Sequence, residues 1–245
     1  METIKELRAL CQGTAPAPQN ESKLGKSTRF FSIYITRYLI NTTITPNQIT
    51  ALSSLVFFVG ICMFFSADYW VWLFGVAVVY FSVVMDGSDG EVARYRKNTR
   101  ISGTVYVEPV SHDIQYGLMF IIIGAAWWVN TGNEVYFVYG TLASIFKLLF
   151  RLLETRYWFA FLDKTVTKES VLEQRYDQKK KPAHIRLVYW VNKNIFSSAG
   201  LVGPLFLAVL FKRMDLFLIL YMCGYVVFFL LLFAKQVRKI SGQQL

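Results

Sequence analysis

The chain alternates long apolar stretches with shorter polar ones, and the apolar stretches approach the length of membrane-spanning helices. About 20 apolar residues cross the hydrocarbon core of a bilayer as a helix. The candidate spans are roughly Asn47–Ser66, Tyr69–Met85, Ile114–Asn130, Val135–Phe150, Ser198–Phe211 and Leu216–Ala234. The fifth of these stretches is short and contains Pro204. The pattern predicts an all-α integral membrane protein with six transmembrane helices.

Segments of mixed character lie between and before these spans. "RFFSIYITRYLI" (Arg29–Ile40) spaces cations among aromatic residues, which predicts an N-terminal amphipathic helix at the membrane interface, and Ala183–Phe196 is similar. We expect residues 1–27 to be a mobile cytosolic arm, 28–240 to form the six-span domain and 241–245 to be a tail. Within the domain, residues 163–182 are expected to form a polar cytosolic loop.

Composition and charge agree with a membrane protein. The chain is 54% hydrophobic and 17% charged, which is too apolar for a soluble domain of this length. Lys and Arg gather in the N-terminal arm, after the second and fourth spans and in the tail, whereas the connections 67–68 and 131–134 have none. Only Lys212 and Arg213 depart from this pattern, so we expect both termini to be cytosolic. The net charge of +10 then reflects topology or phosphate-bearing ligands, and we expect no nucleic-acid partner.

Carboxylates stand where the second span reaches the cytosol. Asp86 lies roughly 25 Å along that helix, near the edge of the hydrocarbon. Asp86, Asp89, Gly90 and Ala93 share one helix face by their spacing. Two neighbouring carboxylates repel each other unless a cation lies between them, and hard divalent cations take oxygen ligands. The small residues leave room for a bulky ligand, and Arg94 can offer a planar fork to a phosphate.

Glu108 and His112 repeat this arrangement at the start of the third span. They are four residues apart on one face, at a depth similar to that of Asp86. A neutral imidazole beside a bound phosphate is a plausible general base, because its reference pKa is near neutrality. Each residue alone also has an ordinary interpretation: Asp89 could pair with Arg94, and Glu108 could cap the helix that Pro109 begins. Together, at one depth, they favour a functional site.

These residues resemble the signature of the CDP-alcohol phosphotransferases, D-x₂-D-G-x₂-A-R-x₈-G-x₃-D-x₃-D. The positions that match it are Asp86, Asp89, Gly90, Ala93, Arg94 and Gly103. "TPNQIT" (Thr45–Thr50) resembles a further stretch common in that family. The last two signature aspartates would fall on Val107 and Ser111, and Glu108 and His112 follow each of them by one residue. The four-residue interval is kept, as if one residue were inserted before the third span.

The resemblance implies an enzyme that transfers a phospho-alcohol or phosphatidyl group from a CDP-alcohol to an acceptor hydroxyl and releases CMP. It implies Mg²⁺ or Mn²⁺ held by Asp86, Asp89 and Glu108, with His112 as the base, and Asp113 is a weaker candidate because it lies 100° away on the helix. The nucleotide would be seated by Asn47, Thr50, Gly90, Ala93 and Arg94. Such enzymes act in phospholipid or lipid-linked metabolite synthesis, among membrane lipids, and are often homodimers.

Two cations in the fourth span suggest a further subsite. Lys147 and Arg151 are four residues apart, at a depth close to that of Asp86. They could hold a phosphate on the acceptor or on a lipid donor. Alternatively, Arg151 pairs with Glu154 or extends to the headgroups.

Two other classes of protein share part of this pattern. A cation transporter also uses intramembrane carboxylates, although it more often has broken helices and repeated halves. A catalytically inactive family relative, kept as a membrane assembly partner, would tolerate the change to Glu108 and His112. Charges gathered at one edge of the bilayer favour the enzyme.

Overall fold

The computed structural model describes residues 2–13, 23–97, 103–161, 187 and 190–241, which form helices and short connections without a strand in these ranges. The α-helices are α1 (Ile4–Cys11), α2 (Lys23–Leu39), α3 (Pro46–Cys62), α4 (Tyr69–Tyr95), α5 (Glu108–Thr131), α6 (Val135–Phe161), α9 (Ser198–Leu210) and α10 (Met214–Ser241). A short 3₁₀ turn, Met63–Phe65, extends α3. Two π-helical turns, Gly103–Val107 and Asn192–Phe196, precede α5 and α9. The predicted all-α membrane class is confirmed.

Five helices in the described ranges are long and apolar enough to cross a bilayer. They are Pro46–Phe65, Tyr69–Tyr95, Glu108–Thr131, Val135–Tyr157 and Met214–Arg238. The remaining predicted span corresponds to α9, which has 13 residues with Pro204 inside it. Such a helix is only about 20 Å long, less than the hydrocarbon thickness. A count of six complete spans therefore stays a prediction.

Local sequence explains where the spans begin and end. Thr45 and Gln48 form a reciprocal capping box at the start of α3, and Pro46 occupies its first turn. Asp68 caps α4 by accepting a hydrogen bond from the backbone N–H of Trp70. Gly132 ends α5 in the left-handed conformation, with φ of 73°, which a residue with a Cβ rarely adopts. "TPNQ" is thus a helix start as well as a family-like stretch.

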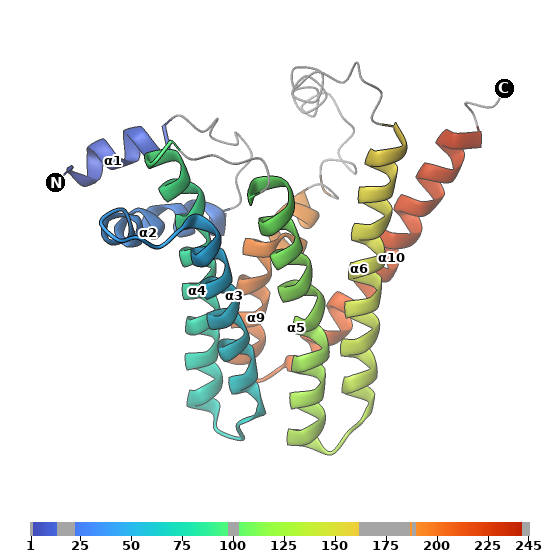
Figure 1. The fold of residues 1–245 in the computed structure, drawn as a ribbon. Helices are drawn as coiled ribbons and strands as arrows, with labels where there is room; N and C mark the ends of the chain where they lie inside the picture. The colour runs from blue at the N-terminus through green and yellow to red at the C-terminus, as the bar shows by residue number, and fades with distance from the viewer. Residues whose placement is uncertain (1, 14–22, 98–102, 162–186, 188–189, 242–245) are drawn as a thin grey trace.

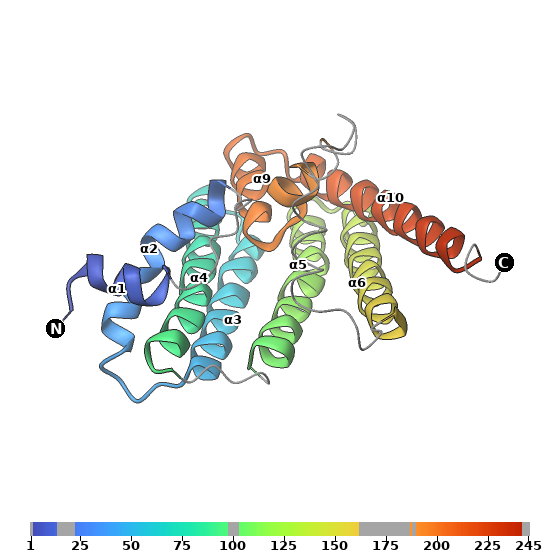
Figure 2. The same ribbon diagram turned by 90° about the horizontal axis from the view of Figure 1, so that it is seen from above.

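Four of the apolar helices stand in a row, and two further helices pack along one side of it. Figure 2 shows α4, α3, α5 and α6 beside one another, with α9 and α10 along one side of the row. The main core lies between these helices and includes an aromatic cluster from α5, α10 and the π-helical turn Asn192–Phe196. In that cluster the ring of Phe120 lies 5.0 Å from that of Tyr221, and Phe196 contacts the same tyrosine at 5.1 Å.

Glycines let neighbouring spans approach closely, as small residues do in membrane bundles. A Cβ added to Gly140 of α6 would lie 2.2 Å from the carbonyl oxygen of Phe120 in α5. A Cβ added to Gly60 of α3 would lie 3.0 Å from the carbonyl oxygen of Gly75 in α4. The helix pairs α5–α6 and α3–α4 therefore depend on these positions.

Replacing Gly140 with valine is expected to separate α5 from α6, because backbone cannot yield as a side chain can. Overpacking of this kind costs typically about 1–3 kcal/mol. We expect a lower melting temperature in detergent and less folded protein on size exclusion. Val138→Leu, on the exposed side of the same helix, is the control. Equal melting temperatures for Gly140→Val and the wild type would contradict this close packing.

The N-terminal segment contains packed helices. We expected residues 1–27 to be mobile, but α1 lies within them, and its Leu7 and Cys11 are fully buried against Ile33 of α2. The polar composition of this segment concealed a helix with one apolar face. Figure 1 shows α2 lying across the end of α4, and α1 beside it. This arrangement agrees with the interfacial helix predicted at Arg29–Ile40, which the structure extends back to Lys23.

Other predicted segments fall wholly or partly outside the described residues. The predicted cytosolic loop at 163–182 lies entirely outside them. Of the second interfacial segment, Ala183–Phe196, only Leu187 and the residues from Trp190 onward are described. The predicted tail starts at Ser241, where α10 ends, and residues 242–245 lie outside the described part.

Candidate active site

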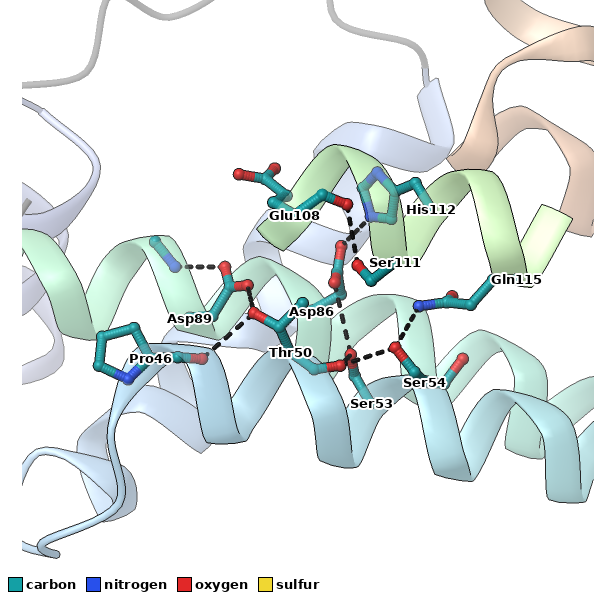
Figure 3. Close-up of polar contacts among 12 residues, drawn as sticks. Pro46, Thr50, Ser53, Ser54, Asp86, Asp89, Glu108, Ser111, His112 and Gln115 are labelled. Atoms are coloured by element: carbon teal, nitrogen blue, oxygen red, sulfur yellow. Dashed lines mark hydrogen bonds and ion pairs between the residues drawn. The ribbon is translucent and has the colours of Figure 1, made fainter. Parts of the chain in front are cut away.

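The predicted site residues come together where α3, α4 and α5 meet. Figure 3 shows Asp86 and Asp89 of α4 between Thr50 and Ser53 of α3 on one side and the first turns of α5 on the other. The face of α4 that carries Asp86 and Asp89 and the face of α5 that carries Glu108 and His112 therefore contribute to one cluster. The start of α3, the end of α4 and the start of α5, which carry these residues, lie in Figure 1 at the end of the bundle where α1 and α2 lie.

Asp86 of α4 and His112 of α5 are in direct contact. His112 Nε2 lies 2.8 Å from Asp86 Oδ2, and Ser53 Oγ donates to Asp86 Oδ1 at 3.4 Å. An ionised carboxylate only accepts, so the tautomer assigned from this contact has its hydrogen on Nε2. The lone pair of the neutral ring then lies on Nδ1, and Figure 3 shows that nitrogen on the side of the ring away from Asp86.

Asp89 is held rigidly by its neighbours. Its side chain accepts hydrogen bonds from the hydroxyl of Thr50 and from the backbone N–H of Gly90. Asp89 is 8% exposed, so these bonds compensate for the water that the carboxylate has lost. Thr50 is followed on α3 by two further hydroxyl residues, Ser53 and Ser54. The hydroxyl of Ser54 accepts a hydrogen bond from the side-chain amide of Gln115 at 2.6 Å.

Glu108 stands one turn before His112 on the same side of α5. Figure 3 shows its carboxylate beside the Asp86–His112 contact rather than within it. Asp86, Asp89 and Glu108 are near enough to interact electrostatically. Within the described part of the chain, no three His, Cys, Asp or Glu side chains converge on a position that could hold a metal ion. The carboxylates are thus neighbours, but they do not form a closed cage.

A match to a family model identifies the family to which the chain belongs. The model of the CDP-alcohol phosphatidyltransferases matches residues 43–183, more than half of the chain. The chain belongs to the CDP-alcohol phosphatidyltransferase family. The match covers α3 to α6 and every predicted site residue. No curated protein matches the chain. As in that family, the reaction class is transfer of a phosphate-linked group from a CDP-alcohol to an alcohol, at a membrane.

The residues expected to seat the nucleotide lie along the C-terminal end of α4 and the start of α3. The guanidinium of Arg94 lies over Gly90, with Nη1 3.2 Å from where a Cβ would stand. A larger side chain at Gly90 would therefore displace Arg94. Asn47 is exposed, and its Oδ1 lies 3.2 Å from the Cβ position of Gly103. Ala93 is half-buried, and Thr50 is held on Asp89 as described above.

The two cations of α6 have different surroundings. Arg151 pairs with Glu154 at 3.2 Å, which is the alternative that its sequence spacing allowed, and also with Asp113 at 2.8 Å. Lys147 is 9% exposed and donates to the hydroxyl of Tyr225 at 3.2 Å. Its ammonium group lies 5.8 Å from the ring of Tyr116, which itself contacts the His112 ring at 5.8 Å. The ring of Tyr116 therefore connects Lys147 to His112.

Some residues of this cluster did not emerge from the sequence. Ser53 follows Thr50 at helical spacing, so the pattern along α3 could have found it. Asp113 was ranked below His112 as a base, and its contact with Arg151 gives it a different role here. Glu91 stands inside the signature and is 1% exposed, yet no spacing rule distinguishes it from a solvated glutamate. Its hydrogen-bond partners precede it in the chain by 55 residues or more.

Proposed function

We propose that this protein transfers a phospho-alcohol or phosphatidyl group from a CDP-alcohol to an acceptor hydroxyl, with His112 as the general base. The observation that carries the proposal is the 2.8 Å contact between His112 Nε2 and Asp86 Oδ2. It orients the ring and directs the Nδ1 lone pair away from Asp86. A neutral imidazole held in this way can accept a proton from a substrate hydroxyl.

The proposed reaction balances with the groups present. The acceptor hydroxyl gives its proton to His112 Nδ1 while its oxygen forms a bond to the β-phosphorus of the donor. The bond between that phosphorus and the bridging oxygen breaks, and the oxygen leaves with CMP. Arg94 binds the phosphates through its Nη groups, and Gly90 and Ala93 leave space for the nucleotide. Asn47 and Thr50 are the remaining residues proposed to bind the nucleotide.

Glu108 and His112 are proposed to replace the last two signature aspartates. Each follows its family position by one residue, and the π-helical turn Gly103–Val107 lies directly before them. A π turn closes its hydrogen bonds over five residues instead of four. The fifth residue after Gly103 in such a turn therefore stands near the place of the fourth in an α-helix. The turn thus supports the view that the inserted residue leaves the catalytic face of α5 in register.

The donor set is chemically suited to a divalent metal. Family members generally use divalent metals. Asp86, Asp89 and Glu108 supply hard oxygen ligands, and three carboxylates this close are better tolerated with a cation than without one. We propose that these three residues would hold Mg²⁺ or Mn²⁺. When bound, the ion neutralises phosphate charge and polarises the phosphoryl oxygens.

The donor and acceptor can be identified by a screen. Purified protein is incubated with a panel of CDP-alcohols and with CDP-diacylglycerol, each with a soluble or a lipid alcohol, and CMP release is measured. We expect release with at least one pair, dependent on Mg²⁺ or Mn²⁺ and abolished by EDTA. No release from any pair would favour the inactive relative instead. Assembly as a homodimer and an active site that faces the cytoplasm also stay predictions, to be checked by light scattering and by labelling in oriented vesicles.

Lys147 is proposed to bind a phosphate on the acceptor or on a lipid donor. Lys147→Met keeps the side-chain volume and removes the charge, so we expect the KM for that substrate to rise roughly tenfold or more, as loss of a charged hydrogen bond costs about 1.5–3 kcal/mol. Arg151 is a weaker candidate for this role, because two carboxylates already pair with it. Lys212→Met, outside this site beside Tyr69, is the control. An unchanged KM for Lys147→Met would remove the residue from the site.

A further inference from the structure

The N-terminal helix α1 docks onto the C-terminal end of α4 through a small core of its own. Leu7 and Cys11 are fully buried there with Ile33, and Tyr95 of α4 packs against them. Burial also raises the pKa of the Cys11 thiol, as expected away from water. Helix α1 lies outside residues 43–183, so it is not part of the segment that carries the family signature.

Glu91 joins three helices at this place. Its carboxylate accepts hydrogen bonds from Gln12 at 2.7 Å, from Ser32 at 2.6 Å and from Thr36 at 2.6 Å. With 1% of its surface exposed, this carboxylate depends on those donors, because a buried charge without hydrogen bonds is costly. Gln12 directly follows α1, and Ser32 and Thr36 belong to α2. Glu91 thereby fixes both helices to α4.

The same joint places a backbone carbonyl against Arg94. The Nε–H of Arg94 donates to the carbonyl oxygen of Cys11 at 2.5 Å. Cys11 is the last residue of α1, and the last carbonyls of a helix have no partner within it, so a cation is a favourable one. Because Gln12 is the next residue, its bond to Glu91 sets the position of this carbonyl.

We propose that α1 is a positioning element for the donor nucleotide, with Gln12 and Glu91 as positioning residues that act through Arg94. The inference rests on the proposed function, in which Arg94 binds the donor phosphates. An arginine side chain has about 2 kcal/mol of rotamer entropy. The Cys11 carbonyl occupies Nε and holds the guanidinium over Gly90, so part of this entropy is lost before the nucleotide binds.

The test is a double-mutant cycle on nucleotide affinity in the full-length protein. CDP with Mg²⁺ is the probe, and its Kd is measured by calorimetry for the wild type, Gln12→Ala, Arg94→Ala and the double variant. We expect Gln12→Ala to raise the Kd roughly fivefold in the wild type and less than about 1.5-fold when Arg94 is alanine, because the effect passes through Arg94. Lys5→Ala, on the exposed side of α1, is the matched control.

The outcomes separate this inference from the function on which it rests. A wild type that binds CDP and a Gln12→Ala variant with the same Kd would overturn the inference alone. An equal rise in both backgrounds would also overturn it, since a general loss of structure has that effect. A wild type that binds no CDP would overturn the proposed function and this inference with it. Should Gln12→Ala misfold, Leu7→Ala loosens the buried apolar face of α1 instead and must show the same dependence on Arg94.

A second measurement follows the docking of α1 itself. In a protein with Cys62 and Cys223 changed to serine, a water-soluble maleimide reacts with Cys11 only when α1 opens. Coupling between two events is reciprocal, so CDP with Mg²⁺ is expected to slow this labelling severalfold. Arg94→Ala is expected to abolish that protection. If CDP still protected Cys11 from labelling in the Arg94→Ala variant, α1 would not be coupled to the nucleotide through Arg94.

Discussion

Replacing His112 with alanine is expected to lower kcat by about 10²–10⁴-fold, the usual contribution of a positioned general base. The donor is bound by groups on α3 and α4, so its affinity should stay within a few-fold of the wild type. CMP release under saturating substrates measures the first quantity, and calorimetry with CDP and Mg²⁺ measures the second. Turnover that survives the substitution would refute the role of His112 as base.

A glutamine at the same position tests whether His112 acts as the general base or only holds Asp86 in place. His112→Gln keeps an amide N–H that can donate to Asp86, but it has no group that can accept a proton at neutral pH. If the imidazole serves as the base, both variants lose turnover to a similar degree. A glutamine variant that keeps most of the activity would mean that His112 only holds Asp86 in place.

The second large effect is expected for Asp89→Asn. Asparagine can still accept from Thr50, but it has lost the charge that a divalent cation needs, and its amide nitrogen faces either Thr50 or the N–H of Gly90. Metal ions supply several kcal/mol of transition-state stabilisation, so we expect a loss of at least about 10³-fold in kcat/KM, roughly 4 kcal/mol. CMP release gives the activity, and Mn²⁺ affinity by electron paramagnetic resonance gives the metal binding.

Asp68→Asn is the matched control for that experiment. The same change is made on the same helix, at its opposite end, where Asp68 caps α4 and asparagine caps nearly as well. We expect this variant to keep its activity and its affinity for Mn²⁺. Wild-type Mn²⁺ affinity in Asp89→Asn would show that the metal, if present, is bound without this carboxylate.

Much of the helical framework follows from local pattern. Apolar runs located α3, α4, α5, α6 and α10, because a helix that faces lipid on one side and other helices on the other must be apolar nearly throughout. Helix α9 was the uncertain case for the same reason: Pro204 and a short run leave it below the length of a span. Helix α1 was missed, since its polar residues hide an apolar face that only the contact with α2 and α4 makes significant.

For the candidate site, spacing predicted which residues share a face and little more. Asp86 with Asp89, and Glu108 with His112, follow from the helical period alone. That His112 contacts Asp86, and that Arg151 pairs with Asp113, depends on how far α5 and α6 are rotated about their axes. The sequence offered Arg151 both a phosphate and Glu154 as partners, and packing brought Asp113 as well.

The sequence by itself determined a helical membrane protein of a known family, with acidic and basic groups gathered at the ends of its spans. Those features are local, because hydrophobicity, helical period and a signature are all written within a few turns of one helix. Tertiary structure alone decided the Asp86–His112 contact, the burial of Lys147 and the joint at Glu91. Each of these joins helices whose relative rotation and depth arise from the packing of all their side chains at once, which no short stretch of sequence encodes.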